Sequence, residues 1–312
     1  MLKIRQKDIM ENWLFDDEIY ISVICCTFNQ ELYIEDAING FLSQKCDYKF
    51  EIILHDDCST DKTIDILDKY KNEYPDIIKV IKCTKNLFSN VGINEPFRNA
   101  LNNSNGKYIA ICEGDDYWID EYKIQKQIME LEKNKNKNIV ITRAISLYPD
   151  HKQSSFCDLG NKKIILPFEF CIMGPKKDFF PTCTFFIRRD ILLDMPEWFY
   201  SIAPVGDYYI QLLAAKYDGA IYLPCKTAIY RRNAINSWSR NKNYDKYIKD
   251  LNARIKILDE LCDIEPIKYR KFLVNKKINM IRLKAEFSLN EKKLIAGLFF
   301  MFIFCFKKYI KD

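Results

Sequence analysis

The sequence contains few of the residues that metalloenzymes and hydrolases commonly use. Its 312 residues include only two histidines, His55 and His151, which argues against a His-rich zinc site or a Ser-His-Asp triad. With only nine Gly and ten Pro, the chain is neither collagen-like nor of low complexity. Metal or acid–base chemistry would therefore rest mainly on carboxylates.

A disulfide framework and an export signal are also missing. The twelve cysteines are scattered, mostly within apolar runs, and no CxxC pair occurs, which favours a reducing compartment. The first 13 residues mix charged and apolar side chains and lack the apolar segment of a secretory signal. We therefore expect a cytoplasmic protein.

What the sequence has is a composition typical of a folded chain and an uneven charge. Apolar residues make up 48% and aromatic residues 14%, enough for one large domain or two modest ones. The net charge of +5 divides into +9 for residues 240–312, with 18 Lys and Arg against 9 Asp and Glu, and −4 for the preceding residues. The basic tail suggests an acidic or membrane-like partner.

Near its end the tail carries an uncharged run of 13 residues, 294–306, with lysines on both sides. A membrane-spanning helix needs about 20 apolar residues, so this run is too short to span a bilayer comfortably. Two interpretations remain open. The run is either a buried terminal helix or an interfacial anchor whose lysines meet anionic headgroups. Nucleic acid is not an expected partner, because an apolar run has no role on a phosphate backbone.

Strand-like and helix-like patterns alternate through the first part of the chain, which predicts an α/β domain with a mostly parallel sheet. The predicted strands are 19–28, 51–54, 77–81, 107–112, 139–147, 182–188 and 220–223. The predicted helices lie near 34–42, 64–70, 124–131 and 207–217, the second of them capped by Ser59 or Thr60. Residues 148–180 show no clear pattern, and helical patterning dominates from about 243. We divide the chain into an N-terminal leader (1–18), the α/β domain (19–239) and a separate basic helical region (240–312).

Polar clusters follow three of the predicted strands: residues 27–31, Asp56 with Asp57, and 113–116. For each cluster taken alone, a strand-to-helix turn or a helix cap is the better explanation. Ligands of open α/β sheets, however, bind at the carboxyl ends of the strands. Three clusters at such ends therefore indicate a binding site.

The third cluster, Glu113-Gly114-Asp115-Asp116, is the most specific. Three carboxylates within four residues form a hard-oxygen site suited to Mg²⁺ or Mn²⁺, ions that proteins often share with substrate phosphates. Without a cation the acids would repel one another and raise their pKa values. Gly114 allows a sharp turn or a close approach of ligand to backbone.

These motifs together resemble the nucleotide-sugar half of family 2 glycosyltransferases with the GT-A fold. The resemblance rests on ISVICCTFNQELYIEDAINGFLSQ, FEIILHDDCSTDKT and KNLFSNVGINEPFRNALNNSNGKYIAICEGDDYW, covering residues 19–130 closely and continuing more loosely to about 240. It implies a Rossmann-like, mostly parallel sheet flanked by helices. It also implies a nucleoside-diphosphate sugar as donor, with UDP as the expected nucleotide, and Mn²⁺ or Mg²⁺ as cofactor.

The resemblance also implies roles for individual residues. One acid of the pair Asp56 and Asp57 accepts a hydrogen bond from a uracil-like ring, and Asp115 and Asp116 lie near the metal. Glu113 stands where Asp is commoner, which leaves open which acid bonds the metal and which the ribose. The residues implied in nucleotide binding are Thr27, Phe28, Asn29, Glu31, Asp56, Asp57, Asn86, Arg98, Glu113 and Gly114.

The family's catalytic base maps to Asp207, 91 residues beyond Asp116. As a base it would take the proton of the acceptor hydroxyl in a single displacement with inversion. The plainer alternative is that Asp207 only caps its helix.

A further segment, Tyr230-Arg231-Arg232-Asn233, resembles the family's Y-R-x-H motif. Asn233 replaces the histidine, so the third protein ligand of the metal stays open, and Arg231 or Arg232 would stabilise the diphosphate. Trp118 and Trp238 would stack on sugars or pack in the core. Thr184 is expected on the acceptor side.

The sequence thus predicts a metal-dependent, inverting glycosyltransferase acting on a glycan or lipid-linked acceptor in bacterial surface polysaccharide synthesis, such as lipopolysaccharide or capsule. It would work at the inner face of the cytoplasmic membrane. One alternative is a catalytically inactive nucleotide-sugar-binding or scaffolding subunit, which Glu113 and Asn233 keep open. Another is a sugar nucleotidyltransferase, which usually needs a Gly-rich phosphate loop that the segment CCTFNQE lacks.

Overall fold

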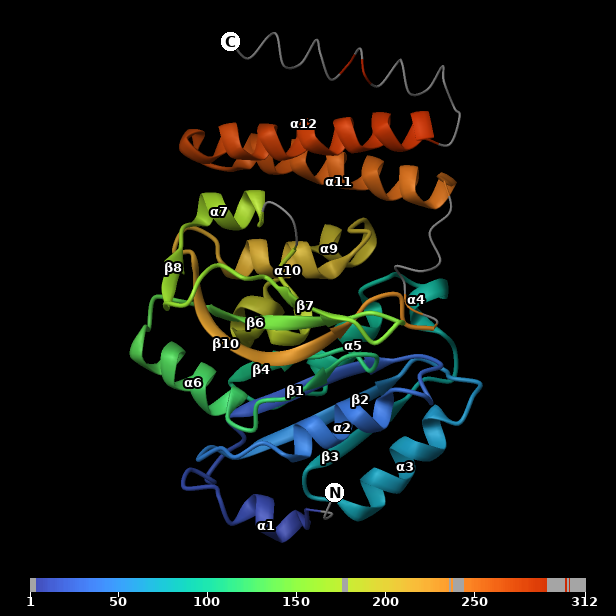
Figure 1. The fold of residues 1–312 in the computed structure, drawn as a ribbon, viewed down its shortest axis with the longest axis vertical. Coiled ribbons are helices and arrows are strands. Elements are labelled where there is room, and N and C mark those ends of the chain that lie inside the picture. The colour runs from blue at the N-terminus through green and yellow to red at the C-terminus, as the bar shows by residue number, and fades with distance from the viewer. Residues whose placement is uncertain are drawn as a thin grey trace.

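The structure is a computed structural model that describes residues 4–175, 179–235, 237 and 244–290, together with 301 and 303. Figure 1 shows helix α1 at one end, a twisted sheet in the middle and the long helices α11 and α12 near the opposite end. The α/β fold predicted from the sequence is confirmed.

One half of the sheet is parallel and contains the first four predicted strands. Its order is β3-β2-β1-β4, formed by β1 (Ile21–Thr27), β2 (Phe50–Asp56), β3 (Ile78–Lys82) and β4 (Tyr108–Ile111). Thr27 pairs with Asp56 in the β1–β2 register, so both strands end at the same level. The loops that follow β1 and β2 therefore lie next to each other.

Helices cover both faces of this parallel half. Residues Val23 and Cys25 of β1 pack in one hydrophobic cluster with α2 (Ile34–Leu42), α3 (Thr63–Glu73) and α6 (Lys123–Lys133). Ile24 packs in the other cluster, with α5 (Glu95–Asn102) and α10 (Gly206–Ala214). Because successive side chains of a strand point to opposite faces, the nearly continuous apolar run of β1 contributes to both clusters.

The other half of the sheet is mixed. Strand β9 (Phe186–Arg188) runs antiparallel between β4 and β6 (Ile139–Leu147), while β6 pairs in parallel with β10 (Ala220–Arg231). Short antiparallel strands complete it: β5 (Tyr117–Trp118), β7 (Gln153–Phe156) and β8 (Ile164–Leu166).

Several predicted boundaries were wrong. The predicted strand 182–188 begins as a 3-10 turn, η1 (Thr182–Thr184), and the predicted strand 220–223 continues to Arg231. Helix α3 begins after Lys62 rather than at a Ser59 or Thr60 cap. Helices that were not predicted from the sequence include α5 and four short ones: α4 (Leu87–Asn90), α7 (Phe168–Met173), α8 (Arg189–Leu193) and α9 (Glu197–Ser201).

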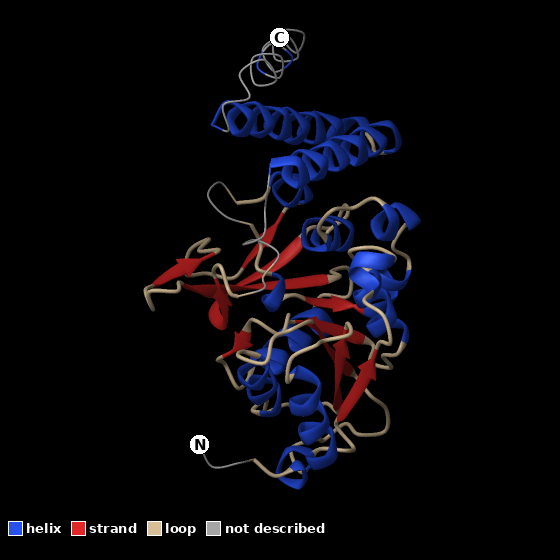
Figure 2. Ribbon diagram, turned by 90° about the vertical axis from the view of Figure 1, so that its right-hand side faces the viewer, coloured by secondary structure: helices blue, strands red, loops and turns tan. Residues whose placement is uncertain are grey.

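The C-terminal helices α11 (Tyr244–Ile264) and α12 (Ile267–Asn290) form an antiparallel hairpin that packs on α7. Figure 2 shows this pair lying beyond the strands at one end of the molecule. These helices pack against the α/β domain, because Leu258 and Leu273 belong to the same hydrophobic cluster as Leu212 of α10. Glu265, only 3% exposed, also pairs with Lys216 at 2.8 Å.

No helix within the described ranges combines the length and apolar character needed to cross a bilayer. The predicted apolar run at 294–306 lies outside the described residues, apart from 301 and 303.

The N-terminal segment packs against the body of the protein. Helix α1 (Gln6–Met10) buries Ile9, the Tyr74 hydroxyl donates a 2.6 Å hydrogen bond to the Ile4 carbonyl, and Phe15 forms a bridge with Tyr48. The part of the predicted leader that the structure describes is thus anchored to α3 and the start of β2.

Candidate functional site

The loops after β1 and β2 are joined by hydrogen bonds from side chains predicted to contact the nucleotide. Asn29 Oδ1 accepts from the Thr60 N–H at 2.7 Å, and Glu31 Oε2 accepts from the Lys62 N–H at 2.9 Å. Asn29 has a left-handed φ of 52°, which Asn adopts more readily than most residues. Asn29 and Glu31 therefore shape the binding loop.

Two neighbours of these residues differ in exposure. Thr27 is buried, and its hydroxyl bonds to Gln30 Oε1 at 2.7 Å. Phe28 is 40% exposed, so its ring is available at the mouth of the loop.

The acids after β2 have different partners. Asp57 caps α4: its Oδ1 accepts from the Leu87 N–H at 2.6 Å and its Oδ2 from the Phe88 N–H at 3.0 Å. Asp56 Oδ2 accepts from the Ser59 N–H at 3.0 Å, whereas its Oδ1 is buried and finds no hydrogen-bond partner within the described structure. Of the two acids, Asp56 is therefore the one whose buried oxygen can accept a hydrogen bond from a ligand.

The two pocket residues suggested by the resemblance are engaged with protein groups. Asn86 is the N-cap of α4, where its Oδ1 accepts from the Ser89 N–H at 2.8 Å. Arg98 pairs with Glu95 and Glu197 and lies over the ring of Tyr200. The structure places Asn86 beside Asp57 but directs Arg98 to α9.

The acidic motif connects β4 to β5, with Asp116 buried and Glu113 and Asp115 half-buried. Burial raises the pKa of Glu113 to about 8, with Asp115 and then Asp207 contributing by charge repulsion. Burial also raises the pKa of Asp115, and it raises that of Asp116 well above its usual range, with repulsion from Asp115 second. The close packing of negative charge predicted from the sequence is present.

Gly114 has a tighter packing role than the sequence indicated. A Cβ atom there would clash with the side-chain amide of Gln30 and meet Ile34 Cδ1 and Thr27 Oγ1, each at 3.0 Å. The close approach at this glycine is thus made by the protein's own β1–α2 loop.

Arg231, at the end of β10, holds the acidic motif in place. Its backbone N–H donates to Asp116 Oδ1 at 2.8 Å, and its guanidinium donates to the Asp115 carbonyl at 2.8 Å. The same guanidinium pairs with Asp36 and lies near the ring of Tyr33 at 5.0 Å. The sequence had assigned Arg231 to the diphosphate and had missed Asp36, because nothing in the pattern of α2 connects it to the end of β10.

Asp207 lies at the start of α10, and its Oδ1 accepts from the Tyr208 N–H at 2.6 Å. It is near enough to Glu113 to contribute to the raised pKa of that residue. The buried Asn94 supports this end of α10, donating to the carbonyls of Phe199 and Ala203. The fold thus brings the predicted base within electrostatic range of Glu113, while the Tyr208 N–H hydrogen-bonds its carboxylate at the start of α10.

The residues predicted around the acceptor are placed unevenly. Trp118 is only 3% exposed, with its indole N–H bonded to the Cys183 carbonyl at 2.9 Å, so it packs in the core and offers no face to a sugar. Thr184 is fully buried and donates to the Pro181 carbonyl. Arg232 lies over Phe156 and donates to Ser146. Trp238 lies outside the described residues.

Asn233 occupies the position of the family's histidine. It is exposed and has a left-handed φ of 56° in the turn after β10. The structure therefore places an exposed amide here.

The acidic motif fits a divalent cation. Glu113 Oε2 is buried and makes no hydrogen bond to any described residue, and burial raises the pKa of all three carboxyl groups, with charge repulsion adding to it at Glu113 and Asp116. A hard cation relieves such repulsion and prefers carboxylate oxygens. Glu113, Asp115 and Asp116 are the residues that would hold it.

The architecture, with a curled sheet and an acidic motif at the strand ends, is that of GT-A glycosyltransferases. Residues 22–195 match the sequence profile of Glycosyl transferase family 2, and the chain belongs to this family.

Two proteins are similar in sequence to this chain over about 70% of its length. An uncharacterized protein of Mycobacterium tuberculosis is 30% identical over 220 residues, covering 70% of this chain and 60% of that protein. The dTDP-rhamnosyl transferase RfbG of Shigella flexneri is 26% identical over 235 residues, covering 72% and 77%. The chain thus spans about 60% of the length of its mycobacterial relative.

Two solved structures share the fold. Staphylococcus aureus TarS in complex with UDP-GlcNAc superposes with a TM-score of 0.57 at 15% identity, covering 87% of this chain and 83% of that one. The mannosyltransferase PcManGT of Pyrobaculum calidifontis, in complex with GDP-Man and Mn²⁺, gives a TM-score of 0.58 at 15% identity, covering 86% and 72%.

Proposed function

We propose that the protein is a divalent-metal-dependent, inverting glycosyltransferase that uses a nucleoside-diphosphate sugar, with UDP as the first candidate nucleotide. The main support is the acidic motif that follows β4, which Asp207 of α10 approaches closely enough to contribute to the raised pKa of Glu113. Relatives with similar assignments include a putative teichuronic acid glycosyltransferase of Bacillus subtilis and the poly(ribitol-phosphate) N-acetylglucosaminyltransferase of S. aureus. The proposed acceptor is a hydroxyl of a glycan or lipid-linked glycan in cell-surface polysaccharide synthesis.

In this proposal each residue acts through the group that the structure leaves available. Asp56 accepts a hydrogen bond from the ring N–H of a pyrimidine base through its unpartnered, buried Oδ1. Asp207 accepts the proton of the attacking hydroxyl while the start of α10 fixes its orientation. Mg²⁺ or Mn²⁺ held by Glu113, Asp115 and Asp116 would supply charge neutralisation at the diphosphate.

The direct test is release of nucleoside diphosphate from a panel of sugar nucleotides with Mn²⁺ and polysaccharide or lipid-linked acceptors. Wild type should turn over, and Asp207→Asn should retain donor binding but lose activity by about 100-fold or more, as for the loss of a general base. Product anomeric configuration, read by NMR, should be inverted relative to the donor. Donor binding without turnover by wild type would instead support an inactive binding subunit.

We further propose that the basic C-terminal segment brings the enzyme to an anionic membrane surface. The support is its charge of +9 and the lysines on both sides of the apolar run 294–306. A surface of this kind would suit a lipid-linked acceptor.

A further inference from the structure

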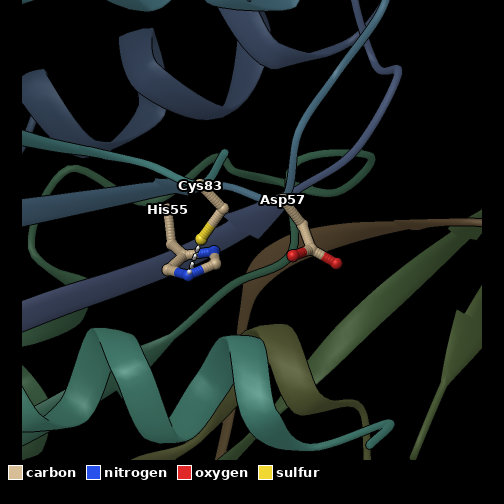
Figure 3. Close-up of side chains that lie close together, drawn as sticks. All are labelled: His55, Asp57 and Cys83. Carbon is tan, nitrogen blue, oxygen red and sulfur yellow. Dashed lines mark hydrogen bonds between the residues drawn. The ribbon is translucent and has the colours of Figure 1, made fainter. Parts of the chain in front are cut away.

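A second polar cluster, separate from the acidic motif and from Asp207, lies at the ends of β2 and β3. It consists of His55 of β2, Asp57 just beyond it and Cys83 just after β3. One potential ligand atom from each residue lies within 4.8 Å of the other two. Figure 3 shows the sulfur of Cys83 directed at the imidazole of His55, with the carboxylate of Asp57 nearby.

We propose that His55, Asp57 and Cys83 form a binding site for Zn²⁺, separate from the Mg²⁺ or Mn²⁺ site of the acidic motif. Imidazole nitrogen, thiolate sulfur and carboxylate oxygen are the ligands that zinc takes in proteins, whereas Mg²⁺ and Mn²⁺ prefer oxygen alone.

The first support is the state of the imidazole. His55 is fully buried, and its Nδ1 has no hydrogen-bond partner among the residues that the structure describes. Its Nε2 lies 3.3 Å from Cys83 Sγ. Among the described residues the buried imidazole thus has only one hydrogen-bonding contact, to a thiol, which a metal bond at Nε2 would replace, leaving Nδ1 to bind a water.

The second support is geometric. Zinc–sulfur and zinc–nitrogen bonds of about 2.3 and 2.0 Å place the two ligand atoms roughly 3.5 Å apart in a tetrahedral site. The 3.3 Å between Cys83 Sγ and His55 Nε2 is close to that value. The Cys83 backbone is fixed as well, because its N–H donates to the Asp56 carbonyl at 3.0 Å.

Asp57 can contribute an oxygen without releasing α4. Each of its carboxylate oxygens accepts one backbone N–H, from Leu87 and Phe88 respectively. A carboxylate oxygen has two lone-pair positions, so each keeps one for a metal. Zinc binding would remove the proton of the Cys83 thiol to solvent and leave the fourth coordination position to water.

A bound ion would tie together the end of β2, the end of β3 and the start of α4. These are the elements that surround Asp56, so the site would stiffen this side of the proposed base pocket. The zinc site does not depend on the proposed function, because its ligands belong to neither the acidic motif nor Asp207.

The test uses the full chain, freed of metal by a chelator and titrated with Co²⁺ as a spectroscopic substitute for zinc. Wild type should bind one Co²⁺ with a thiolate-to-cobalt charge-transfer absorption, and one equivalent of Zn²⁺ should abolish it. Cys83→Ser and His55→Gln should lose this absorption and weaken binding by at least about tenfold. Cys262→Ser, which changes a partly buried thiol of α11, is the matched control and should keep it. Absence of the band in wild type, or its survival in Cys83→Ser, would overturn the site.

A second measurement needs no substitution and therefore does not depend on variants that fold. Alkylation of wild-type Cys83 by iodoacetamide, followed by mass spectrometry, should slow at least about tenfold with Zn²⁺, because a metal-bound thiolate is shielded. Mg²⁺ should not slow it, and Cys262 should react equally with and without zinc. Equal rates at Cys83 in both conditions would count against the proposal.

Discussion

The backbone N–H of Arg231 donates a 2.8 Å hydrogen bond to Asp116 Oδ1, joining two residues 115 positions apart. Its guanidinium also bonds the Asp115 carbonyl and pairs with Asp36 of α2. One arginine at the end of β10 thus connects the acidic motif to α2. This places Arg231 as a positioning residue for the proposed metal ligands.

Replacing Arg231 with Met should lower kcat by about 10- to 100-fold and raise the Mn²⁺ concentration needed for half-maximal activity, as for groups that orient metal ligands. Arg231→Lys should recover part of the loss, because it keeps the charge but not the planar fork. Asp36→Asn, which removes only the ion pair, should have a smaller effect. Steady-state kinetics across a Mn²⁺ titration provide the measurement. An unchanged metal dependence in Arg231→Met would show that the contacts of the Arg231 side chain do not position the proposed metal ligands.

Asp56 and Asp57 are adjacent and equally buried, but substitutions at the two positions should affect different properties, donor binding and stability respectively. Asp56→Asn should raise the KM for the sugar nucleotide by about 10- to 100-fold, because a charged hydrogen bond to the base is lost, with little change in thermal stability. Asp57→Ala should lower the free energy of unfolding by about 1–2 kcal/mol through loss of the α4 cap. Donor kinetics and denaturant unfolding of both variants separate the roles. If Asp57→Ala affects only KM, the assignment is reversed.

Lys123 is fully buried beneath Trp118, and burial lowers its pKa to about 8. Between that pH and its ordinary pKa of 10.5 the unfolded chain holds a proton that the folded protein has released. Stability should therefore rise with pH across this window, while below about pH 8 the protein carries the full cost of a buried charge.

Lys123→Met should accordingly stabilise the protein at pH 7 by on the order of 1–3 kcal/mol, the loss of the 2.8 Å bond to Gln127 offsetting part of the gain. Denaturant unfolding at pH 7 and pH 10 should show the advantage shrinking at the higher pH. A variant less stable than wild type at both values would mean that the contacts of Lys123 outweigh its desolvation.

Removing residues 291–312 tests the role of the basic, apolar C-terminal segment. The full chain should co-sediment with vesicles containing anionic lipid, less so at high salt, whereas a chain ending at Asn290 should remain in solution. Vesicles of neutral lipid serve as the control. Loss of the folded circular-dichroism signal on truncation would instead favour the buried-helix interpretation.

The sequence by itself determined the α/β class, the central strands and the acidic motif. Their signals are local: a nearly continuous apolar run such as 19–28 requires burial on both faces, and the acids that follow β4 are close together in the chain. Family membership followed from the same ordered motifs and was confirmed.

Only the tertiary structure decided that Asp57, and not Asp56, has both carboxylate oxygens hydrogen-bonded to the backbone of α4. It also decided that Trp118 is a core residue and that Arg231 hydrogen-bonds the acidic motif. It also brought Cys83 to His55, from strands whose pairing no local pattern reveals. The reason is physical: a side chain's hydrogen-bond partners and exposure are set by segments that arrive from elsewhere in the chain. Sequence spacing limits which groups can meet, but the packing of the sheet selects which of them do.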